Sequence, residues 1–147
     1  MNEFEKCEEI GRNKTKMLFP NYQFAESPDI SEVWDFSGQT PTLNYFIEVK
    51  DRQISSTAFD SSILEADKLK NLTAIADANG KANMYYLCFY TDGVAYSYNL
   101  RNISITDINI VIKNAGRKTV IDVGKKDKIF IEIPHRLGRK YIYQVTK

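Results

Sequence analysis

The chain has 147 residues, 43% of them hydrophobic and 27% charged, a composition typical of a globular protein of one domain. No apolar run approaches the 18 residues of a membrane helix, and the acidic residues 1–9 lack the apolar segment of a secretory signal, so we expect a soluble, cytoplasmic protein with no membrane partner. One histidine and two cysteines argue against a zinc site built from these residue types.

The first predicted element is a helix over residues 2–17. Phe4, Gly11 and Leu18 fall on one stripe of this segment, and most of its charged side chains lie around that stripe. Glu8 lies close to the inward stripe, four residues after Phe4. A proline and an asparagine then end the helix.

Short strands are predicted after this helix. Residues 33–36 form one strand, residues 37–41 a turn, and residues 43–50 a second strand that completes a hairpin. Residues 53–57 are predicted to form a short third strand.

The second predicted helix covers residues 62–78, with N-cap candidates at residues 60–62 and a C-terminal Asn-Gly pair. The apolar run over residues 84–90 indicates a central strand covered on both faces, and a Thr-Asp-Gly turn leads into a partner strand over residues 94–98. The rest of the chain is β-rich, with strands expected over residues 103–113, 119–123, 128–133 and 140–145.

This element order predicts an α+β fold in which helices flank a mixed central sheet. We expect a single domain over residues 1–147, with a core over residues 1–98 and a basic, β-rich extension over residues 99–147. Cys7 and Cys88 both lie in apolar surroundings and are predicted to be buried free thiols, which fits a reducing compartment.

The strand over residues 43–50 carries the residues that suggest chemistry. Because side chains alternate along a strand, Glu48 and Lys50 are neighbours on one face, whereas Val49 points to the other. Asp35, which precedes the predicted turn, can fold beside them. Two carboxylates and an ammonium group at one end of a sheet suit a divalent metal ion and a phosphate.

These residues carry a resemblance to a known family. Asp35, a twelve-residue gap and Glu48-Val49-Lys50 resemble the D-x(n)-(D/E)-x-K signature of the PD-(D/E)xK nuclease superfamily. The order of the elements over about residues 1–98 is also similar to that family's α-β-β-β-α-β core, so the resemblance implies a restriction-endonuclease-like fold. Trp34 stands where the family motif often has proline.

The resemblance implies hydrolysis of DNA phosphodiester bonds with Mg²⁺ or Mn²⁺. It makes Asp35 and Glu48 metal ligands, together with the backbone carbonyl of Val49, and it makes Lys50 the catalytic lysine. Many family members add a glutamate from the first helix, and Glu8 is the candidate nearest the inward face. A compact nuclease of this kind fits a bacterial or phage origin.

A second lysine, Lys68, lies four residues after Leu64 and four before Leu72, so a charged residue shares one side of the predicted helix with two apolar ones. Family members often project a lysine, glutamine or tyrosine from this helix toward the site. The resemblance therefore implies that Lys68 is an accessory catalytic group that reaches the phosphate or the second carboxylate. The alternative is a boundary lysine that pairs with Glu65.

The charge is unevenly distributed along the chain. Residues 113–147 contain ten basic and three acidic side chains, whereas residues 1–112 contain ten basic and sixteen acidic ones. This asymmetry favours a polyanionic partner such as DNA, including branched or single-stranded DNA. Lysines that protect sheet edges are the alternative, and the terminal hairpin strands can instead form a homodimer. The candidate nucleic-acid-binding residues are Arg52, Arg117, Lys118, Lys125 and Lys126. For Arg52, the alternative is an ion pair with Asp51.

Two other functions stay open at this stage. One is a catalytically inactive module that keeps the nuclease fold and binds nucleic acid or a protein partner. The other is a structural α+β protein in which Asp35, Glu48 and Lys50 are ordinary surface residues. The enzyme requires the carboxylates of Asp35 and Glu48 to converge, with the Lys50 ammonium group beside them, whereas divergence of these groups onto opposite faces of the sheet supports the structural protein.

Overall fold

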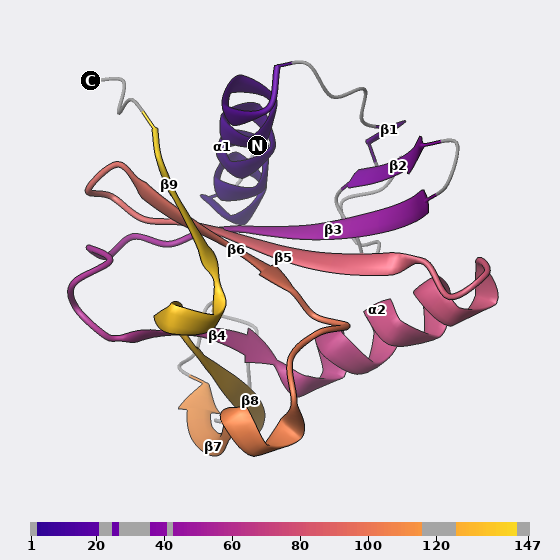
Figure 1. The fold of residues 1–147 in the computed structure, drawn as a ribbon. Coiled ribbons are helices and arrows are strands. Elements are labelled where there is room, and N and C mark those ends of the chain that lie inside the picture. The colour runs from indigo at the N-terminus through magenta and orange to yellow at the C-terminus, as the bar shows by residue number, and fades with distance from the viewer. Residues whose placement is uncertain (1–2, 21–24, 27–35, 41–42, 116–125, 144–147) are drawn as a thin grey trace.

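The computed structural model describes residues 3–20, 25–26, 36–40, 43–115 and 126–143. Two sheets and two long helices make up this part of the chain (Figure 1). The elements are α1 (Glu3–Leu18), β1 (Ala25–Glu26), β2 (Phe36–Thr40), β3 (Leu43–Asp51), β4 (Ser61–Glu65), α2 (Ala66–Ala78), β5 (Asn83–Phe89), β6 (Val94–Asn99), β7 (Asn109–Ala115), β8 (Lys126–Pro134) and β9 (Arg139–Ile142), with single 3-10 turns at Ile105–Asp107 and His135–Leu137.

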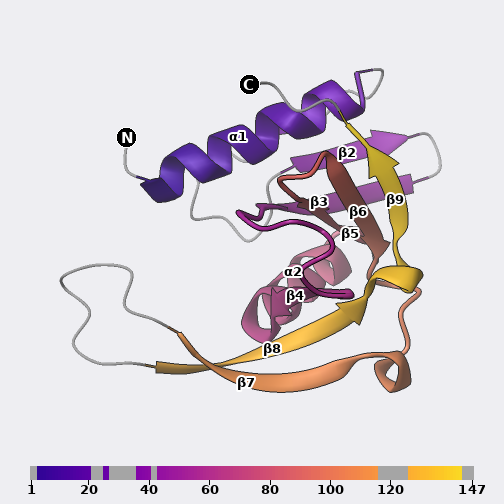
Figure 2. The same cartoon turned by 90° about the vertical axis from the view of Figure 1, so that its left-hand side faces the viewer.

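The larger sheet has six strands in the order β1-β2-β3-β5-β6-β9, and the smaller sheet has three in the order β4-β8-β7. The pair β3–β5 is parallel, and the other strand pairs are antiparallel. Figure 2 shows α1 on one side of the larger sheet and α2 with the smaller sheet on the other. This arrangement confirms the predicted α+β class with a mixed central sheet flanked by helices.

The predicted element order α-β-β-β-α-β is present as α1, β2, β3, β4, α2 and β5, but the third strand was misplaced. Residues 53–57 form no strand, and the strand is β4, which covers residues that were predicted to cap and begin the second helix. β4 pairs along its length with β8, about 70 residues later in the chain. That long-range pairing outweighs the local helix-start signal of Asp60 to Ser62.

The predicted turn over residues 37–41 is also wrong over most of its length. Residues 37–40 belong to β2, where they pair residue by residue with β3 up to the contact between Thr40 and Leu43. Pairing with a strongly apolar neighbour overrides the turn-like composition of Ser37 and Gly38. The predicted strand over residues 33–36 lies outside the described residues except for Phe36, as does the whole strand predicted over residues 119–123.

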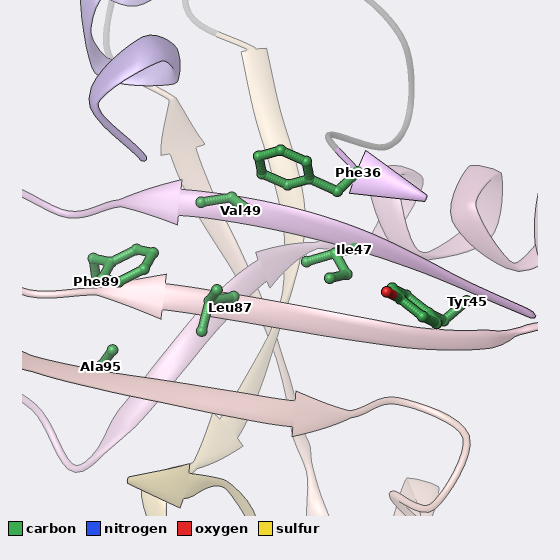
Figure 3. Packing of buried hydrophobic residues seen from close by; sticks show 7 residues of the cluster. All are labelled: Phe36, Tyr45, Ile47, Val49, Leu87, Phe89 and Ala95. Atoms are coloured by element: carbon green, nitrogen blue, oxygen red, sulfur yellow. The ribbon is translucent and has the colours of Figure 1, made fainter. Parts of the chain in front are cut away.

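One face of β3 and β5 forms the core beneath α1. Figure 3 shows its side chains pointing to the same side of the sheet, and Leu18 and Phe19 at the end of α1 pack against them. Odd-numbered residues of β3 supply this face, as the alternation predicts. The buried members are Phe36, Tyr45, Ile47, Val49, Leu87, Phe89 and Ala95.

Gly11 lets α1 approach this face closely. A Cβ atom added at Gly11 would lie 3.0 Å from Cγ1 of Val49. We expect Gly11→Val to destabilise the fold by about 1–3 kcal/mol, because overpacking outweighs the small gain in helix propensity. Urea denaturation measures the difference. Asn13→Val, at an exposed position of the same helix, should change the stability by less than about 0.5 kcal/mol, and equal stabilities of the two variants would contradict the tight contact.

The opposite face of the larger sheet packs against α2 and the smaller sheet. Phe46 and Met84 contact Leu72 and Ala76 of α2. Nearer the smaller sheet, Tyr86, Cys88, Tyr90 and Tyr98 pack against Leu64, Ile131 and Ile133. Cys88 is a buried free thiol, as predicted, and the side chain of Cys7 lies outside the described residues. No helix in the described ranges is long and apolar enough to span a membrane.

His135 closes one end of this second core. Its ring stacks on Tyr96, with centroids 4.1 Å apart, and its Nε2 atom lies 3.3 Å from the Tyr90 hydroxyl. Burial lowers the pKa of His135, and attraction to Asp60 and a hydrogen bond with the Ser61 backbone only partly oppose that effect. The folded chain therefore binds a proton at this ring less readily than the unfolded chain does.

We expect protonation of His135 to destabilise the fold. The loss of stability should occur as the pH falls from about 6.5, the ordinary pKa of histidine, to the lowered pKa of His135 in the folded state. Stability measured by denaturation between pH 7 and pH 5 should decline less steeply in His135→Gln than in the wild type. Comparing the two slopes removes the contribution of the other titrating groups. Identical slopes would show that the His135 ring does not contribute.

Candidate active site

Glu48 and Lys50 lie on the face of β3 that is turned toward α2, and both line one cavity of about 110 Å³. Glu48 is only 5% exposed, although it is a charged residue in the second half of β3. Buried carboxylates need charged or hydrogen-bonding partners. The cavity lies where β3, β5, β4 and α2 meet, and its lining residues are Glu48, Lys50, Arg52, Ile63, Leu64, Glu65, Lys68, Tyr86 and Phe130.

Lys68, in the first turn of α2, holds the buried carboxylate. Its Nζ atom donates a hydrogen bond to Oε1 of Glu48 over 3.2 Å. Burial acts to lower the pKa of Lys68, but attraction to Glu48 and this hydrogen bond, with weaker attraction to Glu8 and Glu65, leave the pKa raised. Lys68 is therefore a cation at neutral pH, and Glu8 of α1 lies near enough to stabilise its charge.

Glu65 is a further candidate site residue, which the sequence suggested only as an alternative partner of Lys68. It ends β4 and lines the cavity, and it accepts a hydrogen bond from Lys128 of β8 over 3.1 Å. Burial acts to raise the pKa of Glu65, but the contact with Lys128 and attraction to Lys68 and Lys50 leave it lowered. Its strand pairing with Phe130 brings it to the cavity, and a β assignment for Ser61–Glu65 is the signal that would have found it.

Arg52 also lines the cavity, but its contacts differ from those expected. Its Nη2 atom donates to the carbonyl of Ile63 over 2.7 Å and to the Tyr86 hydroxyl over 3.2 Å. The alternative that Arg52 pairs with Asp51 is wrong. Asp51 contacts Lys14 instead, with 2.6 Å between Oδ1 and Nζ, because adjacent residues of a strand point to opposite faces.

Val49 places its side chain in the core beneath α1, where it is 2% exposed. Its side chain therefore points away from the cavity, and only its backbone can contribute to a site beside Glu48. Several predicted site residues cannot be placed against this cavity. Asp35, Arg117, Lys118 and Lys125 lie outside the described residues, and Lys126 is described only in its backbone, at the start of β8.

The donor atoms near the cavity suit a hard cation. Glu48 and Glu65 line the cavity and offer carboxylate oxygens, the ligands that Mg²⁺ and Mn²⁺ prefer, and the charge of Glu8 acts on Lys68 from α1. No group of three His, Cys, Asp or Glu side chains in the described ranges is placed to hold a metal ion. Mg²⁺ commonly uses one or two carboxylates with waters and substrate phosphates, so Glu48 fits as one ligand, and Asp35 is the second carboxylate that the sequence predicts.

The sequence matches no protein-family model and no curated protein. A solved structure does match. The chain is similar in fold to a Holliday junction resolvase. That protein is Hjc of Archaeoglobus fulgidus, an archaeal hyperthermophile, and the match covers 87% of this chain and 93% of the resolvase with a TM-score of 0.54 and 16% sequence identity. At this identity the likeness shows the fold, and it confirms the predicted restriction-endonuclease-like arrangement.

Proposed function

We propose that this protein is a metal-dependent nuclease of the PD-(D/E)xK kind that hydrolyses phosphodiester bonds of DNA. The observation that supports the proposal most directly is the meeting of Glu48 and Lys50 of β3 with Lys68 of α2 around one cavity. In an ordinary surface strand, a glutamate and a lysine two residues apart would both extend into water. Here the glutamate is 5% exposed and held by a lysine from a separate helix.

In this proposal Mg²⁺ or Mn²⁺ is held by Glu48, Asp35 and the backbone carbonyl of Val49, with Glu8 as a further carboxylate. When bound, the ion would act as a Lewis acid that polarises the phosphate and lowers the pKa of an attacking water. Lys68 orients the Glu48 carboxylate through its hydrogen bond. Lys50, on the same face of β3, orients the water or stabilises the negative charge that develops on the phosphate.

DNA is the proposed substrate, and branched DNA is the form to test first. The structural neighbour is named for its action on a four-way junction. In the C-terminal part of this chain, Lys113 and Lys128 face each other across β7 and β8 and are both exposed. We propose that this hairpin, with Arg117, Lys118, Lys125 and Lys126, attracts the phosphate backbone and that two copies of the chain act together on two strands.

The test is to incubate the protein with plasmid, single-stranded and four-way junction DNA in Mg²⁺, in Mn²⁺ and in a chelator. Cleavage of at least one substrate only when metal is present is the expected result. A catalytically dead variant purified in the same way controls for contaminating nuclease. Absence of metal-dependent cleavage on all three substrates would overturn the enzyme proposal.

A second candidate function is a binding module that does not cut. The charges in the cavity favour it, since the described lining residues include three basic side chains, Lys50, Arg52 and Lys68, against two acidic ones. Such a cavity attracts a phosphate without a metal. The module predicts DNA binding that is equal in Mg²⁺ and in chelator and that persists in Glu48→Gln, whereas the enzyme predicts binding or cleavage that depends on the metal.

A further inference from the structure

The residues around the cavity come from two sheets that share no strand. Glu48 and Lys50 belong to β3 of the six-stranded sheet, whereas Glu65 and Lys68 belong to the junction of β4, in the three-stranded sheet, with α2. The geometry of the site therefore depends on contacts that fix one sheet against the other. A shift of about 1 Å in such a constellation can cost about a hundredfold in rate.

One such contact is a cluster of three groups, which we call the inter-sheet bracket: the Arg52 guanidinium, the Tyr86 hydroxyl and the Ile63 carbonyl. Arg52 Nη2 donates to the Ile63 carbonyl over 2.7 Å and to the Tyr86 hydroxyl over 3.2 Å. The Tyr86 hydroxyl donates to the same carbonyl over 2.8 Å. Three polar groups from β5, β4 and the end of β3 thus bond one another.

The bracket is anchored in the larger sheet at both of its side chains. The backbone N–H of Arg52 donates to the carbonyl of Phe89 over 2.8 Å and so extends the pairing of β3 with β5. Tyr86 lies directly beside Glu48 in the parallel register, is 1% exposed and stacks on Tyr98. Both donors therefore have fixed positions relative to Glu48.

The acceptor of the bracket, the Ile63 carbonyl, lies just before the segment that carries Glu65 and Lys68. Ile63 precedes Glu65 by two residues, and β4 passes directly into α2 at Ala66. The side chain of Glu65, the N-cap residue of α2, makes no capping hydrogen bond in the part of the chain that the structure describes. The hydrogen bonds to the Ile63 carbonyl therefore limit the movement of the segment from Ile63 to Lys68, because a partly buried carbonyl is costly to leave without its guanidinium and hydroxyl donors.

We propose that Arg52, acting with Tyr86, is a positioning residue that holds the β4–α2 segment, and with it Lys68, at the correct distance from Glu48 and Lys50. This inference rests on the proposed nuclease function. In this proposal, the main role of Arg52 is to position the β4–α2 segment and not to contact the DNA backbone. A planar guanidinium can bridge a carbonyl and a hydroxyl in a fixed geometry, which a flexible ammonium group does less well.

The bracket is not the only support of β4, so its loss should leave the chain folded. Ser62 is 1% exposed, and its hydroxyl lies 2.6 Å from the Tyr90 hydroxyl and 2.7 Å from the Tyr98 hydroxyl. Leu64 packs in the same core. Variants of the bracket are therefore expected to move the first turn of α2 without unfolding the sheets.

The first experiment compares cleavage kinetics of the whole protein carrying Arg52→Ala, Arg52→Lys or Tyr86→Phe. We expect kcat to fall by about 10–100-fold in Arg52→Ala and less in the other two, with KM within about threefold of the wild type, because geometry is lost and substrate contacts are kept. The control is Arg101→Ala, which removes an arginine that also bonds a backbone carbonyl, that of Ala82, outside the cavity. An unchanged kcat in Arg52→Ala, or an equal loss in Arg101→Ala, would overturn the proposal.

Chemical rescue separates positioning from general destabilisation. Guanidinium ion at a non-denaturing concentration should restore part of the kcat of Arg52→Ala, whereas methylammonium at the same ionic strength should not, and neither should help Tyr86→Phe. Absence of rescue at concentrations that leave the wild type fully active would count against the bracket, because the cavity left by Arg52 lies beside an open pocket.

Amide hydrogen exchange tests the bracket even if no DNA is cut. We expect at least tenfold faster exchange at residues 69–71, the first amides of α2 that have an acceptor within the helix, in Arg52→Ala and Tyr86→Phe, with no change at residues 74–78 of the same helix. If the wild type lacks cleavage but exchange changes as expected, the nuclease proposal fails and the positioning geometry stands. If cleavage is present and exchange at residues 69–71 is unchanged in both variants, the positioning inference is wrong.

Discussion

Glu48→Gln is expected to reduce metal-dependent DNA cleavage by about 10²–10³-fold or more while the chain stays folded. The substitution keeps the shape of the side chain and an oxygen that can accept the hydrogen bond from Lys68, but it removes the negative charge that would hold a divalent cation. Because Lys68 is still partly exposed to water, its ammonium group tolerates the loss, so we expect only a small change in thermal stability. Plasmid relaxation in Mg²⁺ and Mn²⁺ measures the activity.

The matched control for this substitution is Glu9→Gln, which neutralises an exposed carboxylate of α1. This variant should cleave DNA within about twofold of the wild type, since surface charges distant from the site change rates only slightly at physiological salt. If Glu48→Gln keeps more than about a tenth of the wild-type rate in both metals, then Glu48 is not a metal ligand and the candidate site is wrong. A variant that unfolds at the assay temperature is replaced by Glu48→Asp, which keeps the charge and shortens the reach.

The alternation of apolar and charged side chains along β3 allowed the positions of Glu48 and Lys50 to be predicted from the sequence. Tyr45, Ile47 and Val49 fill the core beneath α1, whereas Glu48 and Lys50 face the cavity, as the alternation requires. A strand that is buried on one face has only one register that keeps its apolar side chains out of water. The local sequence therefore specified which residues of β3 meet, without knowledge of their neighbours.

The β4 segment was not predictable by the same means. Asp60 to Ser62 have the composition of a helix start, and Ile63 and Leu64 fit the apolar stripe of the predicted helix. Their strand conformation comes from pairing with β8, which is distant in sequence. For the same reason Glu65 was not recognised as a site residue, because its place at the cavity depends on the end of a strand that only long-range pairing creates.

The partners of Lys68 and Arg52 also depend on contacts between elements that are distant in the sequence. Lys68 reaches Glu48 across the space between α2 and β3, whereas Glu65 takes Lys128 as its partner. A helical wheel places Lys68 on the inward side but cannot say which carboxylate it meets. Arg52 lies two residues after the predicted motif, yet its contacts lie on β4 and β5, and no local pattern indicates them.

Lys50→Met is expected to separate cleavage from binding. The substitution keeps the length of the aliphatic chain and removes the charge, so we expect the cleavage rate to fall by about 10²–10³-fold, because stabilisation of the charge that develops in the transition state is lost. Binding of junction DNA in Ca²⁺, measured by fluorescence anisotropy, should weaken by less than about tenfold, since Glu48 and the basic hairpin remain. A large loss of rate with near-normal affinity is the signature of a group that acts in the transition state.

Lys128→Met is the contrasting variant, because this lysine of β8 contacts Glu65 at the rim of the cavity. If the hairpin attracts DNA through its charge, Lys128→Met should weaken binding and reduce its dependence on salt, with little change in the rate at saturating DNA. The binding module without catalysis makes a different prediction for Lys50→Met: the variant binds DNA more weakly, and neither it nor the wild type cleaves DNA. Equal behaviour of the two lysine variants in both assays would therefore exclude a distinct catalytic role for Lys50.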